Sequence, residues 1–206
     1  MGSQALSKLN TRLGEIELLL QAHEALVKLR KAESGLSDPD AVSLKDALRY
    51  LQNLVDDVGP GRPPEVQAVN KAAVALLSAH LQGYLVDVHR ECAHALLRSK
   101  VESVDAIIDE APTSGNPNVD NITRLFASIG FPKVLDGVSW NRMSNDSVRK
   151  RLRELNELRN RIVHGAQESV QKATVKNYLG FVNQLTAKLD SKLGARTGKL
   201  TGSPPW

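Results

Sequence analysis

The sequence has few aromatic residues and a single cysteine. Aromatic side chains make up 4% of the 206 residues, whereas Leu, Ala and Val are plentiful. This shortage disfavours a β-sandwich, which needs more aromatic and β-branched residues, and favours helices packed on helices. The one cysteine, Cys92, cannot form an internal disulfide, and no CxxC or Cys/His cluster offers a metal site. We therefore expect an all-α protein that binds no metal and no cofactor.

Long apolar runs are missing as well. No uninterrupted stretch could span a bilayer, and the N-terminus lacks the charged and apolar regions of a signal peptide. We therefore expect a cytoplasmic protein with no membrane partner. The formal net charge of +4 permits a polyanionic partner but does not demand one.

Apolar residues at helical spacing divide the chain into helices that glycine and proline separate. Long helices are expected over residues 4–32, 43–58, 63–100, 145–165 and 169–193, and short ones over 103–110 and 118–129. The expected fold is a helical bundle of about five to seven helices with a long N-terminal helical extension. Residues 1–60 would form an N-terminal segment packed on the bundle, 61–193 the main domain and 194–206 a loose tail.

The helix that ends at Gly165 has an arginine within its apolar face. At about 100° per residue, six apolar side chains between Val148 and Val163 share one arc, and Arg159 lies near its middle. A guanidinium directed at a core or a subunit interface is costly unless a carboxylate, phosphate or other acceptor meets it. Arg159 taken alone favours a structural ion pair with an acid on a neighbouring helix. The alternative is a functional site, where departures from the apolar pattern are expected.

A histidine, His164, closes the same helix. The helix dipole favours a protonated imidazole at this end, and Asn160, one turn earlier, can orient the ring. Arg159 and His164 are separated by about 140° around the helix, so one helix does not bring them together. Two such helices meeting around a two-fold axis could do so, in a cleft that the two subunits of a homodimer share. Taken by themselves, a lone arginine and a terminal histidine are more often structural residues.

The motif and its surroundings resemble a known family. Arg159 and His164 match the R-x4-6-H motif of HEPN domains, including the polar residue, Asn160, directly after the arginine. The flanking segments resemble the RiboL-PSP type of HEPN domain in particular, and the likeness covers roughly residues 65–190. The segments that carry it are 79–87, 116–118, 122–126, 130–131 and 155–158.

This resemblance implies a HEPN bundle with metal-independent endoribonuclease activity, in which the 2′-hydroxyl of the RNA attacks the adjacent phosphate. Such chemistry needs a group that moves protons and a cation that stabilises charge on the phosphate. His164 suits the first role, Arg159 the second, and Asn160 would orient them. RNA is the implied substrate, in a toxin, defence or stress-response setting, with an antitoxin or other regulatory protein as a candidate partner.

Further polar residues are candidates for supporting roles. Arg149 and Arg153 share the side of the helix that carries Asn160 and His164, and with Arg161 they are candidate contacts to RNA phosphates. An ordinary surface ion pair between Arg153 and Glu157 is the alternative. On the long helix, Tyr84 and Asp87 could support Arg159 or simply belong to a polar face between helices.

One position departs from the family pattern. Relatives often carry Glu two residues before the tyrosine of the early helix, whereas this chain has Gln82. If that acid supports the motif arginine, its loss leaves Arg159 freer for a phosphate but less firmly positioned. The alternative function is a HEPN fold without catalysis that binds RNA or a partner protein. A helical DNA-binding protein is disfavoured because no helix-turn-helix pattern is recognisable.

Overall fold

The computed structural model describes residues 2–35, 64–97, 104, 108 and 115–206. Within them lie five helices and no strand, apart from an isolated bridge between Trp140 and Met143. This confirms the predicted all-α bundle. The predicted helix over 43–58 and most of the one over 103–110 lie outside the described residues. The helices are α1 (Gln4–Gly35), α3 (Pro64–Leu97), α5 (Val119–Ala127), α6 (Asn145–Val163) and α7 (Lys172–Thr201).

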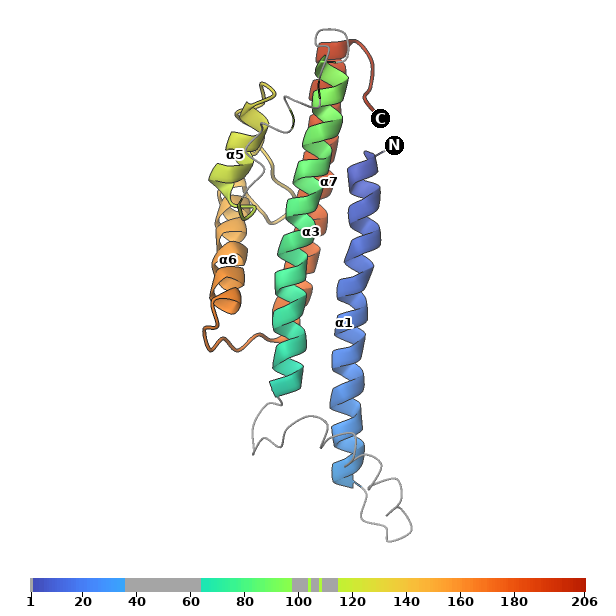
Figure 1. Cartoon of the computed structure of the whole chain (residues 1–206), viewed down its shortest axis with the longest axis vertical. Coiled ribbons are helices and arrows are strands. Elements are labelled where there is room, and N and C mark those ends of the chain that lie inside the picture. Colours follow the sequence, from blue (N-terminus) through green and yellow to red (C-terminus); the bar gives the residue numbers. More distant parts are fainter. Residues whose placement is uncertain (1, 36–63, 98–103, 105–107, 109–114) are drawn as a thin grey trace.

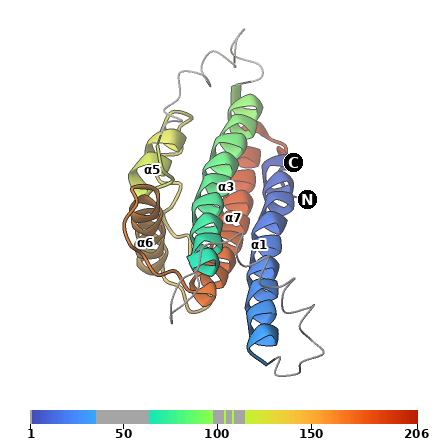
Figure 2. The ribbon, with the colours of Figure 1, turned by 60° about the horizontal axis from the view of Figure 1, so that its bottom comes forward.

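Helix α3 lies at the centre of the bundle. It packs against α1 and α7 along its length, and against α6 and α5 on its other side (Figure 1). The view turned by 60° shows the same order, with α1 and the pair α5 and α6 on opposite sides of α3 and α7 (Figure 2). None of the helices in the described ranges is long and apolar enough to cross a membrane.

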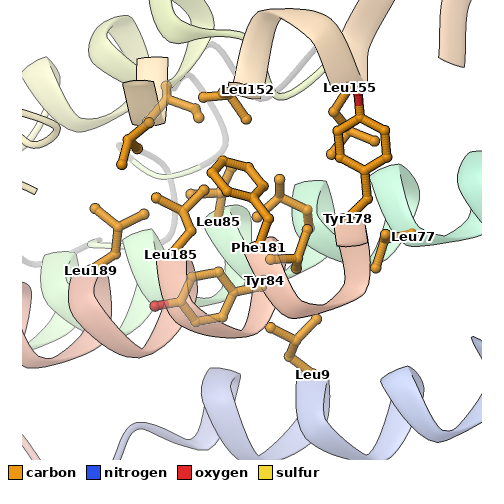
Figure 3. Packing of buried hydrophobic residues seen from close by; sticks show 14 of the residues in the cluster. Leu9, Leu77, Tyr84, Leu85, Leu152, Leu155, Tyr178, Phe181, Leu185 and Leu189 are labelled. Atoms are coloured by element: carbon orange, nitrogen blue, oxygen red, sulfur yellow. The ribbon is translucent and has the colours of Figure 1, made fainter. Parts of the chain in front are cut away.

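The core follows the apolar stripes that helical periodicity predicts, because residues three or four apart share one face of a helix. Figure 3 shows side chains from four helices meeting there: Leu9 from α1, Tyr84 from α3, Leu152 from α6 and Phe181 from α7 among them. The predicted stripe of α3 is buried from Val74 to Cys92, and that of α7 from Val175 to Leu189. The N-terminal helix therefore contributes to the same core as the rest of the bundle.

The predicted loose tail over residues 194–206 is wrong. Helix α7 continues to Thr201 and ends at Gly202, which has a φ of +79°. The chain then turns back, and the Trp206 ring lies so close to Gly194 that a Cβ there would be 3.0 Å from its Nε1 atom. The glycine composition that suggested a loop thus has another cause. A small residue is needed where the returning segment approaches the helix.

Candidate functional site

Helix α6 has capping groups at both ends, and these fix where the motif lies. Ser144 is the N-cap, and its side chain accepts a hydrogen bond from the backbone N–H of Ser147. The helix ends at Val163, with His164 as C-cap and Gly165 at a φ of +78°. A glycine at this position ends a helix without the strain that a side chain would add. The motif histidine is thus placed at the helix end, as the sequence predicts.

The side chain of Arg159 is half-buried and forms a hydrogen bond with a neutral amide rather than an ion pair with an acid among the described residues. Its Nη1 atom donates to Oδ1 of Asn160 at 3.2 Å. In the part of the chain that the structure describes, none of the ion pairs involves Arg159. The structural ion pair that the arginine alone favours therefore has no acid among these residues. The positive charge of the guanidinium is left without a counter-charge there.

The amide of Asn160 joins the arginine to a distant segment. Its Oδ1 atom also accepts a hydrogen bond from Nδ2 of Asn116, at 2.6 Å, across 44 positions of sequence. Asn116 lies in the turn before α5, which Asn156 of α6 holds by donating to the carbonyl of Pro117 at 2.8 Å. The turn before α5 and the motif helix are therefore tied together by amide groups.

The side chain of His164 is exposed at the end of α6. Its backbone N–H donates to the carbonyl of Asn160 at 2.9 Å, which belongs to the helix end. The imidazole has no hydrogen-bond partner among the described residues, and none of the contacts found there joins it to Arg159. The next residue back, Val163, is an exposed apolar side chain, with 53% of its surface accessible. Within one chain, Arg159 is therefore half-buried and His164 exposed, and no hydrogen bond or ion pair in the described residues joins them.

The turn after His164 is held by an ion pair and by backbone hydrogen bonds. The Arg161 guanidinium forms an ion pair with Glu168, and the Ala166 N–H donates to the carbonyl of Arg161 at 2.9 Å. Farther along, Val170 exchanges hydrogen bonds with the start of α3. Its N–H donates to Gln67 at 2.9 Å, and its carbonyl accepts from Asn70 at 2.8 Å. These contacts restrain the segment that leaves the motif.

The three predicted phosphate-binding arginines have different environments. Arg149 donates to Asp136 at 2.6 Å and to Asn145 at 3.2 Å, and Arg161 is paired with Glu168. Arg153 is exposed and, within the described ranges, forms no ion pair with Glu157 or any other acid. Of these three arginines, Arg153 alone has a positive charge that is not paired with an acid among the described residues.

The two candidate supporting residues on α3 lie outside this network. Tyr84 is buried, and its hydroxyl donates to the carbonyl of Thr186 at 3.0 Å. Burial, together with the negative charge of Asp190, raises the pKa of this hydroxyl well above its usual value. Tyr84 is therefore a protonated core residue whose hydroxyl faces α7. Asp87 is half-buried, and no ion pair or hydrogen bond in the described chain links it to Arg159.

Sequence reasoning did not assign a role to Asn116, although the Asn-Pro-Asn segment that contains it was singled out. A signal was present, because a short segment with two asparagines precedes a helix N-terminus. Pattern alone does not reveal which distant side chain such an amide meets. Gln82, the departure from the family pattern, lines a narrow crevice together with Asn116 and Pro117. No group of three or more metal-ligating side chains occurs among the residues that the structure describes.

The comparisons with known proteins give one match. A family model described as RiboL-PSP-HEPN matches residues 41–195, which contain α3, α5, α6 and most of α7. The comparison with curated proteins and the comparison with solved structures returned no match. The matched range includes both motif residues and all the amide groups around Arg159. Helix α1 lies outside it.

Proposed function

We propose that this chain, which belongs to the RiboL-PSP-HEPN family, is an endoribonuclease that needs no metal ion and works at an Arg159/His164 site shared by two subunits. The observation that carries the proposal is the environment of Arg159. Its guanidinium is half-buried in the apolar face of α6 and held by an amide oxygen. A cation positioned without a carboxylate partner keeps its charge for an anionic ligand, and an RNA phosphate is such a ligand.

The reaction assigns one task to each motif residue. The 2′-oxygen of a ribose attacks the adjacent phosphorus as its proton leaves, and the bond from phosphorus to the 5′-oxygen of the next nucleotide breaks. That oxygen takes up a proton, so the products are a 2′,3′-cyclic phosphate and a 5′-hydroxyl. His164, whose imidazole is exposed at the end of α6, suits the proton transfers. Arg159 suits stabilisation of the charge on the phosphate oxygens during the attack.

A second copy of the chain would bring an Arg159 and a His164 close together. Arg159 and His164 are about 140° apart around α6, so a ligand on one helix cannot meet both. The apolar strip of α6 runs through half-buried Ile162, which packs against the subunit's own core, to exposed Val163. An apolar strip next to the motif suits a two-fold contact between α6 helices. We therefore include a homodimer in the proposal.

The proposed setting is the cytoplasm, in a toxin, defence or stress response. A nuclease that needs no metal lacks one common means of control, so its activity must be restrained by other means. A regulatory protein that covers the cleft, as an antitoxin would, is the partner that this argument favours.

The test is cleavage of a labelled single-stranded RNA by purified protein in EDTA, with analysis of the product ends. We expect 2′,3′-cyclic phosphate ends, and loss of cleavage in His164→Ala and in Arg159→Ala with helicity and dimer mass unchanged. Lys150→Ala removes one exposed positive charge from the same helix and should change the rate little. Cleavage retained in His164→Ala contradicts the proposal.

The alternative function is a non-catalytic module that binds RNA or a protein. It is favoured by the pairing of Arg149 and Arg161 with carboxylates, which leaves the surface around the motif less positive than the sequence predicts. Binding of the same RNA without turnover, by protein that is dimeric in solution, would select this alternative.

A further inference from the structure

We propose that Asn116 is a positioning residue: it fixes the amide of Asn160, and through that amide it fixes the direction of the Arg159 guanidinium. The consequence for catalysis rests on the proposed nuclease function. The positioning itself is a property of the folded chain and can be measured whether or not the protein cleaves RNA.

The geometry at Asn160 carries the inference. Its Oδ1 atom accepts two hydrogen bonds, one from Arg159 at 3.2 Å and one from Asn116 at 2.6 Å. A carbonyl oxygen has two lone pairs, so both are used. An asparagine near a helix end can rotate its amide freely when only one flexible partner holds it. The second donor comes from another segment and removes that freedom.

Asn116 can act as a fixed point because its own backbone is held. Its carbonyl accepts hydrogen bonds from the N–H of Asn118 at 2.7 Å and from Nδ2 of Asn121 at 2.9 Å. The next carbonyl, of Pro117, accepts from Asn156 at 2.8 Å, which ties the turn to the motif helix. Gly115 enters the turn at a φ of +115°, a conformation that side chains disfavour. The turn is therefore anchored to both α5 and α6.

The chemistry of these groups suits an anion site. Asn116 and Asn160 are neutral, and the neutral Gln82 lines the same crevice as Asn116. A carboxylate in place of the Asn160 amide would hold the guanidinium more firmly, yet it would also neutralise the charge that a phosphate needs. Neutral amides restrain the direction of the arginine and leave its charge available. Arg159 is therefore positioned by the amides of Asn160 and Asn116, and no acid among the described residues forms an ion pair with it.

The first test follows the Nε–H signal of Arg159 by NMR in the full chain labelled on arginine, with Arg159→Lys used to assign it. We expect Asn116→Ala to shift this signal and to weaken its heteronuclear NOE, because the side chain becomes mobile. Asn118→Ala is the matched control, since it removes the N-cap of α5 two residues away without touching Asn160. An Arg159 signal that is the same in Asn116→Ala and wild type overturns the proposal.

The second test measures RNA cleavage with the same variants. Misplacing a group that acts in the transition state lowers kcat more than it raises KM, so Asn116→Ala should lose about 10- to 100-fold in kcat with a much smaller change in KM. Asn118→Ala should keep its kcat. If wild-type protein does not cleave RNA but its Arg159 signal depends on Asn116, the nuclease function fails and the positioning stands. If cleavage occurs and kcat is unaffected by Asn116→Ala, the positioning fails alone.

A third variant covers the case in which Asn116→Ala does not fold. Asn116→Asp has the same shape and places a negative charge in the amide network. We expect it to bind an RNA analogue with 2′-deoxy substitutions at least fivefold more weakly than wild type, because the new charge offsets that of Arg159. Unchanged affinity in this variant, measured by fluorescence anisotropy, contradicts the amide argument.

Discussion

The guanidinium of Arg161 is paired with the carboxylate of Glu168 across the turn that carries His164. The pair spans seven residues, and Glu168 is the more buried partner. This ion pair neutralises the positive charge of Arg161, which lies directly beside the motif. Arg161 is therefore a cation next to the proposed site that would become available to RNA if its ion pair with Glu168 were removed.

Replacing Glu168 by Gln should leave the Arg161 guanidinium without its ion-pair partner and available to an RNA phosphate. We expect RNA binding to tighten and the dependence of log Kd on log salt to steepen by about 1, as one more phosphate contact becomes available. The free energy of unfolding should change by less than about 1 kcal/mol, because the pair is solvent-accessible. Binding titrations at three salt concentrations measure this. Weaker binding by Glu168→Gln would show that the pair is needed to shape the turn.

Substitutions of Arg149 and Arg153 should affect RNA binding and the free energy of unfolding differently. Arg153→Ala removes an exposed charge that pairs with no acid in the described part of the chain, so RNA binding should weaken while the free energy of unfolding stays the same. Arg149→Ala removes the contacts to Asp136 and Asn145 and should cost about 0.5 kcal/mol of stability. Urea unfolding and anisotropy titrations on both variants measure the two effects. The opposite pattern would mean that Arg149 leaves Asp136 to contact RNA.

The turn before α5 can be tested through its glycine. A Cβ on Gly115 would lie 2.6 Å from Nδ2 of Asn121, the atom that donates to the Asn116 carbonyl. Gly137 also has a positive φ, of +69°, but a Cβ there would meet nothing within 4 Å. Each alanine substitution should cost about 1 kcal/mol for the backbone conformation. Gly115→Ala should cost more than Gly137→Ala, and it alone should slow RNA cleavage. Equal unfolding free energies in urea would contradict the crowding at Gly115.

His89 should make the stability of the bundle depend on pH. Burial, helped by the positive charge of Arg90, lowers the pKa of His89 from 6.5 to about 4. The folded state therefore holds the neutral ring, whose Nε2 lies 2.9 Å from Oγ of Ser128. The unfolded chain binds the proton first, so stability is complete above pH 6.5 and falls as the pH drops towards 4.

The loss attributable to His89 should be at most about 3 kcal/mol, given 1.36 kcal/mol per pKa unit. His89→Gln keeps a hydrogen-bonding group without titrating, and its unfolding free energy should fall less over the same pH range. The measurement is urea unfolding of both proteins between pH 4 and 7. Identical slopes for the two would contradict the lowered pKa of His89.

The sequence predicts the helices and the core well because both follow a short period. The stripes of α3 and α7 are read from residues three and four apart, and burial follows. The contacts of Arg149 and Asn160 with distant residues could not be predicted from this period. Asp136 reaches Arg149 through a loop, and Asn116 reaches Asn160 from 44 positions away, so both contacts depend on how segments meet in space.

The C-terminal segment was misread for a related reason. Its Gly and Thr residues are typical of a loose tail, but α7 continues through them and Trp206 packs back on the helix. Helix propensity is a weak preference that tertiary contacts override. The position of Arg159, by contrast, was visible in the sequence, because a charged residue within an apolar arc stands out by its period alone.

The most direct test of the shared Arg159/His164 site is subunit mixing. Arg159→Ala and His164→Ala are purified separately, unfolded together, refolded at equal amounts and assayed for RNA cleavage in EDTA. Random pairing makes about half of the dimers mixed, and each mixed dimer keeps one Arg159 and one His164 in its cleft. We predict that neither variant cleaves alone and that the mixture regains cleavage with 2′,3′-cyclic phosphate ends. A mixture as inactive as its two components, although mass spectrometry shows mixed dimers, would contradict the shared site.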